Sequence, residues 1–268
     1  THGKTTTTGM LTQLFIQAGK DPSAIIGGKL PFIGSNGRAG KSDIMICEAC
    51  EYVDTFLKLS PAISIILNID ADHLEYFGSL ENIIKSFHQF ANQTSKVLIV
   101  NGDDENVKKA IKDIQDVKII TFGLGADNDY SAANIKEEPN VFEDFTLMKQ
   151  GTPLTDIRLS VPGKHNIMNA LAAAATADYF GISGNDIAKG LHDFTGVHRR
   201  FERLGTFHDI VVADDFAHHP TELNATLTAA MHMGFKNVWA IFQPHTYSRT
   251  FLLLNDFAEA LSIPDHVI

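Results

Sequence analysis

The chain has 268 residues, which is long enough for one large domain or two ordinary ones. Its 22 lysines and arginines against 32 aspartates and glutamates give a formal net charge of −10. An acidic surface disfavours nonspecific binding to nucleic acid and to anionic membranes, so neither is expected as a partner. No apolar run reaches the roughly 18 residues of a membrane-spanning helix. Its two cysteines, Cys47 and Cys50, are too few for a disulfide scaffold and fit a reducing, cytoplasmic setting.

The chain opens on Thr1-His2-Gly3-Lys4-Thr5-Thr6, and a helix-compatible run follows. Gly-Lys-Thr before a helix is the core of a phosphate-binding loop. Gly3 lets the backbone approach a phosphate closely, the helix amides point at the anion, and Lys4 supplies charge to the β- and γ-phosphates. Thr5 offers its hydroxyl to a magnesium ion. The first glycine of a full Walker A loop would lie before residue 1, so a threonine-rich helix cap is the alternative.

Strand and helix signals alternate over the next part of the chain. An apolar-faced helix is expected at 5–18, followed by a glycine-rich connection through 27–28 and 34–40. A short buried strand is expected at 43–47, and the nearly continuous apolar run at 62–69 is typical of a central parallel strand. The remaining elements are a helix at 79–94, a strand at 96–100, a helix at 104–114 and a strand at 117–122. This order predicts a doubly wound, mostly parallel α/β sheet of the phosphate-loop type.

The cysteine pair at the end of strand 43–47 has the C-x-x-C spacing of redox and zinc sites. A zinc site needs further ligands at suitable spacing, and the chain has no other cysteine. A redox pair would open a helix rather than follow a strand. We therefore expect Cys47 and Cys50 to be small buried side chains.

The pattern changes near residue 130. Three short alternating segments with turns between them predict a small antiparallel sheet at the edge of the first domain. They lie at 130–136, 141–148 and 156–161, and helices are expected at 165–180 and 184–193. A second α/β unit follows, with strands at 207–213, at 237–242 and from 266, and helices at 220–233 and 248–262.

Two domains are expected from this order of elements. The first is a central domain over 1–196, and the second is an incomplete Rossmann-like domain over 197–268. Because the chain opens inside a loop and ends as a strand begins, we expect it to be part of a longer protein whose first domain starts before Thr1.

Acidic and ligating side chains follow two of the predicted strands. Glu48 and Glu51 come just after strand 43–47, and Asp70-Ala71-Asp72-His73 comes just after strand 62–69. Ligands of an open parallel sheet bind at the carboxyl ends of its strands, where a phosphate loop also lies. Magnesium prefers oxygen ligands, so a glutamate suits it and a histidine is less usual. The residues alone leave open a solvated acidic turn for the glutamates and a helix-start or surface position for His73.

A third stretch suits recognition of a base. His165 and Asn166 open an alanine-rich helix, and Asn169 lies one helical turn further on. Side-chain amides on one helix face can read the edge of an adenine, and His165 can stack or hydrogen-bond. The alternative is an ordinary helix N-cap with an asparagine in its first turn.

Three polar stretches of the second unit are expected to face the first. A basic run over 196–203 contains Arg200, and arginine can bridge phosphate oxygens. Asp214-Asp215 with His218-His219-Pro220 joins a strand end to a helix start, and Pro220 suits the first helical turn. The stretch over 242–250, which contains Arg249, does the same for the next strand.

Taken in order, these motifs resemble the Mur ligase family of ATP-dependent enzymes that form amide bonds. The resemblance covers nearly the whole chain. It implies three domains, of which the N-terminal uridine-nucleotide domain is absent here, the central ATP-binding domain lacks its start and the C-terminal Rossmann-like domain is incomplete. The motifs are Thr1 to Thr6, Asn68 to His73, His165-Asn166 with Asn169, His198 to Glu202, Asp214-Asp215 with His218 to Pro220, and Phe242 to His245 with Arg249.

The resemblance implies that ATP and Mg²⁺ are the cofactors. In ATP binding, His165 and Asn169 would contact adenine, Arg200 the phosphates and Asp215 the ribose. The full set assigned to ATP is Thr1, His2, Gly3, Lys4, Thr5, Thr6, His165, Asn166, Asn169, Arg200 and Asp215.

The resemblance also assigns metal, substrate and catalytic residues. The metal ligands would be Thr5, Glu51 and His73, with Glu48 as the alternative to Glu51. His218 and Arg249 would line the site where the two substrates meet. Catalysis is assigned to Lys4, His73, Arg200 and His218.

Within the family, the pattern is most similar to the members that join L-alanine to UDP-N-acetylmuramate in peptidoglycan precursor synthesis. The implied reaction has two steps: the substrate carboxylate attacks the γ-phosphate of ATP to give an acyl phosphate, and the amine of L-alanine then displaces phosphate. Catalysis would be mostly positioning and charge neutralisation. Phe216 and Thr246 depart from these members, which often carry Tyr and Arg there. The alternatives are another amide ligase of the superfamily (a murein-peptide recycling ligase or a folylpolyglutamate synthase) and a P-loop switch ATPase.

Overall fold

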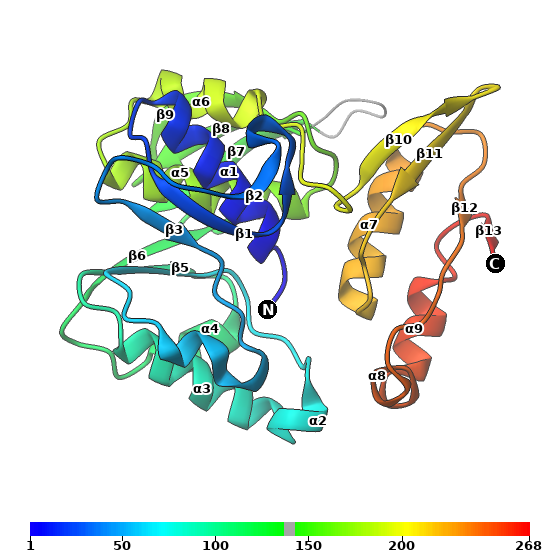
Figure 1. The fold of residues 1–268 in the computed structure, drawn as a ribbon, viewed down its shortest axis with the longest axis horizontal. Helices are drawn as coiled ribbons and strands as arrows, with labels where there is room; N and C mark the ends of the chain where they lie inside the picture. Colours follow the sequence, from blue (N-terminus) through cyan, green and yellow to red (C-terminus); the bar gives the residue numbers. More distant parts are fainter. Residues whose placement is uncertain (137–142) are drawn as a thin grey trace.

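The computed structural model describes residues 1–136 and 143–268. They form two α/β units, and the first residue lies beside the space between them (Figure 1). The strand expected at 141–148 begins outside the described residues, and its described part is β8, Asp144–Lys149. Every helix among the described residues is too short or too polar to cross a bilayer.

A six-stranded sheet forms the centre of the first unit, in the order β4-β5-β6-β7-β8-β9. Its other strands are β4 (Ile63–Ile66), β5 (Val97–Asn101), β6 (Lys118–Gly123), β7 (Tyr130–Lys136) and β9 (Thr152–Arg158). Strands β4 to β7 pair in parallel, and β7 to β9 pair antiparallel. The expected antiparallel edge is therefore confirmed, and it continues the main sheet through the pairing of Phe122 with Tyr130.

Helices cover both faces of this sheet (Figure 1). One face carries α1 (Lys4–Gln17), α5 (His165–Tyr179) and α6 (Gly184–His192), and the other carries α2 (Leu74–Phe77), α3 (Leu80–Asn92) and α4 (Glu105–Ile111). On β5, Val97 and Ile99 belong to the core beneath α1 and α5, whereas Leu98 and Val100 belong to the core beneath α3 and α4. Because successive strand residues point to opposite faces, a continuous apolar run marks a strand buried on both sides.

The glycine-rich stretch after α1 is not a connection, contrary to the expectation from sequence. It folds as β1 (Ser23–Leu30) and β2 (Ser35–Arg38), an antiparallel pair joined by a 3-10 turn at Pro31–Ile33. Gly27 lies within β1, where a Cβ atom would come within 2.5 Å of Glu48 Oε1. Glycine is needed here because a carboxylate approaches the strand closely, and not because the chain turns.

Strand β3 (Met45–Cys47) pairs in parallel with β1 and completes a three-stranded sheet in the order β2-β1-β3. The expectation that it is buried was wrong, because Met45 is 53% exposed and no described strand pairs with the other edge of β3. A groove of about 610 Å³ lies between β3 and β4. Cys47 and Cys50 are exposed free thiols, so the expectation of buried cysteines was also wrong.

Among the described residues, the second unit contains two separate strand pairs. An antiparallel hairpin consists of β10 (Glu202–Phe207) and β11 (Ile210–Asp214), and β12 (Trp239–Ala240) pairs in parallel with β13 (His266–Val267). The helices are α7 (Pro220–His232), α8 (Tyr247–Leu252) and α9 (Leu254–Ala260). The strand expected at 207–213 is thus one arm of a hairpin, and the helix expected at 248–262 is interrupted at Leu253.

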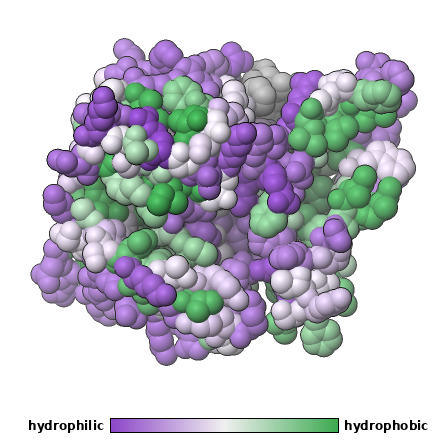
Figure 2. Space-filling model, in the orientation of Figure 1, coloured by the Kyte–Doolittle hydropathy of each residue, from purple (hydrophilic) through white to green (hydrophobic). Residues whose placement is uncertain are grey.

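The second unit has only a small core of its own. Its largest buried side chains, such as Leu223 and Phe257, come from α7 and α9. Apolar side chains instead gather in the open along the β10–β11 hairpin (Figure 2), where Phe207 and Ile210 are 68% and 63% exposed. Polar pairs such as Arg249 with Asp72 and His2 with Glu222 join this unit to the first.

Candidate functional site

A cleft of about 430 Å³ lies where the two units meet. Its walls come from the start of α1, the ends of β4 and β5, the start of α5, the segment 196–201 and the first turns of α7. Ten of the eleven residues expected to contact ATP line this cleft, and Thr1 lines the neighbouring groove instead. The ten are His2, Gly3, Lys4, Thr5, Thr6, His165, Asn166, Asn169, Arg200 and Asp215.

The start of α1 has the geometry of an anion-binding loop. Gly3 is the N-cap, with φ +83°, and no side chain caps the helix. The alternative of a threonine-rich cap is therefore wrong. A Cβ atom on Gly3 would lie 2.3 Å from Asn169 Oδ1, so only glycine fits this position without displacing the asparagine. The uncapped amides of the first turn, at the positive end of the helix dipole, suit a phosphate group.

Lys4 is held at the loop by Glu51. Lys4 Nζ donates to Glu51 Oε1 at 3.0 Å and lies 2.9 Å from Glu51 Oε2, and it also donates to the carbonyl of Thr1. Glu51 is only 2% exposed. A buried carboxylate with a lysine partner fixes that lysine near the helix start, where its charge can meet a phosphate.

Glu48, not Glu51, contacts the hydroxyl expected to bind magnesium. Thr5 Oγ1 donates to Glu48 Oε1 at 2.8 Å, and the Gly27 amide donates to Glu48 Oε2 at 2.6 Å. Arg200 Nη2 lies 3.5 Å from Thr5 Oγ1 and so reaches the same point from the second unit. A hydroxyl beside a carboxylate is a donor set that fits Mg²⁺.

His73 lies apart from this pair and outside the residues that line the cleft. Its ring packs on Tyr52 with centroids 4.6 Å apart, and its Nε2 lies 3.6 Å from Asp72 Oδ2. His73 is the N-cap of α2, with φ +54°. Among the described residues, the expected metal set of Thr5, Glu51 and His73 is therefore not joined by direct contacts.

The two asparagines of α5 form a chain that ends at the phosphate loop. Asn166 Nδ2 donates to the carbonyl of Pro162 at 2.7 Å, and Asn169 Nδ2 donates to Asn166 Oδ1 at 3.0 Å. Asn169 Oδ1 then accepts from Thr7 Oγ1 at 3.2 Å. Asn166 lies in the first turn of α5, but the N-cap Lys164 makes no side-chain cap bond, so the alternative of an ordinary helix N-cap is wrong. His165 is exposed and lines the cleft.

Asp215 organises the backbone of the second unit at the cleft. Its Oδ2 accepts from the Phe201 amide at 2.8 Å, and its Oδ1 accepts from the Ala217 amide at 2.6 Å. Burial raises the pKa of this carboxyl, although the two amide bonds oppose that change. Asp215 thereby ties the segment that carries Arg200 to the segment that leads into α7.

The two residues expected at the substrate site are both engaged elsewhere. Arg249 Nε and Nη2 donate to Asp72 Oδ1 at 3.1 and 2.9 Å, and the two side chains are 7% and 8% exposed. Burial alone would raise the pKa of Asp72, but its electrostatic and hydrogen-bond interactions with His73 and Arg249 together lower the pKa. His218 lies nearer the cleft, with its amide donating to Glu222 Oε2 at 3.1 Å. Arg249 is thus a buried ion-pair partner between the units.

A second polar contact between the units was missed from sequence. His2 Nε2 lies 3.0 Å from Asp70 Oδ2, and His2 Nδ1 lies 3.2 Å from Glu222 Oε1. Burial lowers the pKa of His2, but the bonds to the two carboxylates outweigh it and raise the pKa. The hydrogen bond from His2 in turn holds the pKa of Asp70 well below its usual range. The sequence signal that could have indicated this contact was the position of its two carboxylates. Asp70 follows a predicted strand, and Glu222 lies in the first turn of a predicted helix.

A glycine-capped helix start, carboxylates beside it and a second α/β unit on the other side of the cleft are features of the phosphate-loop class of α/β proteins. The chain matches the Mur ligase middle domain over residues 1–177 and the Mur ligase glutamate ligase domain over residues 199–268. It therefore belongs to the Mur ligase family, as the sequence motifs predict.

The proteins that the chain matches are named as ligases. The chain is 45% identical over 271 residues to a UDP-N-acetylmuramate–L-alanine ligase of Acetivibrio thermocellus, covering 100% of this chain and 58% of that protein. A crystal structure of a UDP-N-acetylmuramate-alanine ligase from Thermotoga maritima matches with a TM-score of 0.84 at 30% identity, covering 100% of this chain and 59% of that one. A murein peptide ligase from Psychrobacter arcticus matches with a TM-score of 0.74 at 26% identity, covering 100% and 61%. The chain thus spans less than two thirds of the relatives it matches.

Proposed function

We propose that the protein containing this chain is an ATP-dependent ligase that joins L-alanine to the carboxylate of UDP-N-acetylmuramate through an acyl phosphate, in peptidoglycan precursor synthesis. Residues 1–196 would form its central ATP-binding domain, and residues 197–268 would form part of its C-terminal domain. The observation that carries the proposal is the cleft at the start of α1, where Arg200 of the second unit reaches Thr5 of the phosphate loop. The similarity to alanine ligases at 43–45% identity over the whole chain supports the substrate pair.

In this proposal the phosphates of ATP bind at the first turn of α1. The uncapped amides and Lys4 bind the phosphate oxygens, and Arg200 adds a second positive charge from the opposite wall. These groups are fixed before the substrates arrive, by Glu51 for Lys4 and by Asp215 for the backbone next to Arg200. Fixed charges of this kind stabilise a transferring phosphoryl group without reorganisation during the reaction.

Magnesium fits the oxygen donors of Thr5 and Glu48. When bound, it would neutralise phosphate charge and polarise the γ-phosphate. Of the two glutamates considered from the sequence, Glu48 is favoured because it touches Thr5 directly, while Glu51 is paired with Lys4. His73 stays a proposed metal ligand. It would join Thr5 and Glu48 only if a bound nucleotide or metal brought the three side chains closer together.

The acceptor site is proposed to lie between His218 and the phosphate loop. The backbone amide of His218 donates to Glu222, and Glu222 lines the cleft. Arg249 reaches a substrate only when its ion pair with Asp72 opens. In the arrangement described here, it supports the site by holding the second unit in place.

A direct test uses the full-length protein with ATP, magnesium and UDP-N-acetylmuramate, and measures phosphate release after each amino acid is added in turn. We expect release to require L-alanine and to stop in the Lys4→Ala variant. A murein-peptide recycling ligase is the second candidate because such a protein shares the fold at 26% identity. If a free murein tripeptide replaced L-alanine with equal or higher efficiency, the second candidate would be the correct one.

A further inference from the structure

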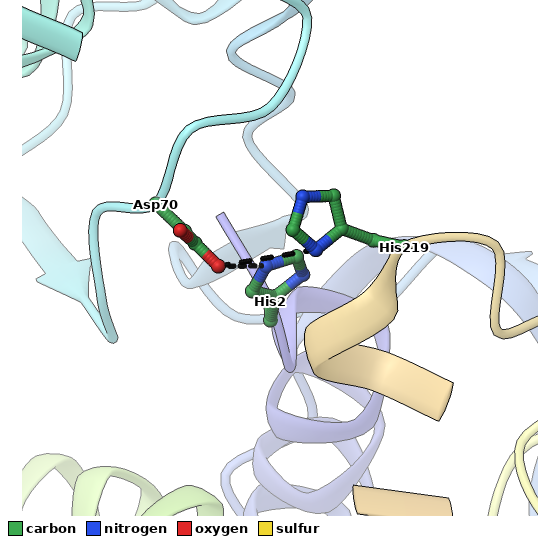
Figure 3. Close-up of side chains that lie close together, drawn as sticks. All are labelled: His2, Asp70 and His219. Carbon is green, nitrogen blue, oxygen red and sulfur yellow. Dashed lines mark hydrogen bonds and ion pairs between the residues drawn. The ribbon is translucent and has the colours of Figure 1, made fainter. Parts of the chain in front are cut away.

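Three potential metal ligands from three distant segments meet at the edge of the cleft. His2 precedes α1, Asp70 follows β4, and His219 is the N-cap of α7 (Figure 3). One ligand atom of each lies within 4.8 Å of the other two. His2 and Asp70 are partly exposed, and His219 is buried. None of the three belongs to the proposed magnesium set.

The distances within this cluster are close to those of a coordinated ion. His2 Nε2 lies 3.0 Å from Asp70 Oδ2, and His219 Nδ1 lies 3.9 Å from the same oxygen. A tetrahedral zinc ion with bonds of about 2.0–2.2 Å spaces its ligand atoms roughly 3.4 Å apart. The first pair must separate slightly and the second must close slightly. His219 Nδ1 must also give up the Thr221 amide, which donates to it at 3.3 Å, when it binds the ion.

The outer contacts of the cluster also match those of a metal site. Glu222 Oε1 lies 3.2 Å from His2 Nδ1, the ring nitrogen that faces away from Asp70. The other ring nitrogen of His219 lies 3.4 Å from the carbonyl of Ala71. A histidine that binds a metal usually donates its second ring N–H to a carboxylate or a carbonyl, which fixes the orientation of the ring. Both histidines here have such a partner.

We propose that His2, Asp70 and His219 bind one divalent transition metal ion, with zinc as the best match. Two imidazole nitrogens and one carboxylate oxygen are a common zinc donor set that leaves one position open for water. The side chain of Asp70 is 36% exposed, so this position faces solvent. Magnesium, which prefers oxygen ligands in an octahedral arrangement, fits the cluster poorly.

Zinc at this point ties the two units together. His2 and Asp70 belong to the first unit, and His219 opens α7 of the second. Neither nucleotide nor substrate is required for binding, so the proposal does not rest on the proposed ligase activity. The bound ion holds α7 against the phosphate loop and raises the thermal stability of the protein.

The test measures metal binding by the full-length protein after removal of metals with a chelator. Co²⁺ serves as the spectroscopic probe, because tetrahedral Co²⁺ absorbs visible light strongly, and Zn²⁺ is titrated in competition, with magnesium in excess. We expect the unmodified protein to bind one ion tightly. The His219→Asn and Asp70→Asn variants should lose this binding. Asparagine at 219 can still accept from the Thr221 amide, so the N-cap is kept.

The matched control is His232→Asn, which removes an exposed histidine at the other end of the same helix. Loss of a group that hydrogen-bonds a metal-binding histidine costs roughly 10–100-fold in metal affinity, so Glu222→Gln should fall within that range, and loss of a ligand should cost at least as much. His232→Asn should leave the affinity unchanged. If His219→Asn fails to fold, Glu222→Gln and the zinc-dependent melting temperature of the unmodified protein decide the question. The proposal is overturned if no ion binds, if binding survives His219→Asn, or if the Co²⁺ spectrum depends on His73 instead.

Discussion

Removing Arg249 should destabilise the attachment of the second unit far more than removing an exposed arginine. Arg249 and Asp72 form two charged hydrogen bonds while both are less than a tenth exposed. Arg249→Ala leaves the buried Asp72 with only His73 beside it, and breaking a buried pair in this way costs about 3–5 kcal/mol. The small core of the second unit gives it little to offset such a loss.

Urea unfolding measures this effect, with fluorescence from Trp239 as the reporter, because it is the chain's one tryptophan and lies in β12 of the second unit. The control is Arg203→Ala, which removes an exposed side chain bonded to Thr206 and should cost less than about 1 kcal/mol. Combining Arg249→Ala with Asp72→Ala should restore part of the loss, with a coupling of about 1–3 kcal/mol. Equal midpoints for Arg249→Ala and Arg203→Ala would refute the reasoning and return Arg249 to a role in substrate binding.

Three further predictions concern the phosphate loop. Lys4→Ala should abolish amino-acid-dependent phosphate release while circular dichroism stays unchanged, because Lys4 supplies the charge at the start of α1, and near-normal turnover would exclude that role. Gly3→Ala should weaken ATP binding at least about tenfold, measured by calorimetry, since a non-glycine residue at positive φ costs roughly 1–2 kcal/mol before the contact with Asn169 is counted. Glu48→Gln should raise the magnesium concentration needed for half-maximal activity more than Glu51→Gln does, and the reverse order would move the metal to Glu51.

Helices and strands could be predicted where neighbouring residues alone determine them. A helix was expected at 79–94, and the structure shows α3 at Leu80–Asn92 with Ser79 as its N-cap, accepting from the Asn82 amide. The continuous apolar run at 62–69 was expected to be a central parallel strand, and its residues Ile63–Ile66 form β4, which pairs in parallel with β5. The central position was wrong, because β4 is the first strand in the order of the described sheet. The start of α1 was expected because Gly3, Lys4 and Thr5 are adjacent in the chain.

Features that depend on distant residues could not be predicted in this way. The glycines at 27–28 were interpreted as part of a connection, although they lie in β1. Glycine is present there because Glu48, 21 residues further on, approaches the strand closely. The partners of Arg249 and His2 lie 177 and 220 residues away in the chain, so neither pairing has a local signal. The sequence placed Arg249 near the meeting of the units but gave no sign that Asp72 occupies its guanidinium.

The most direct test of the proposed chemistry follows an oxygen atom. UDP-N-acetylmuramate labelled with oxygen-18 in its lactyl carboxylate is incubated with the full-length protein, ATP, magnesium and L-alanine, and the released phosphate and the product are analysed by mass spectrometry. Attack of the carboxylate on the γ-phosphate places one carboxylate oxygen in the phosphate, so each ligation should release one labelled phosphate. Unlabelled phosphate, or label transfer without formation of the L-alanine amide, would contradict ligation through an acyl phosphate at this site.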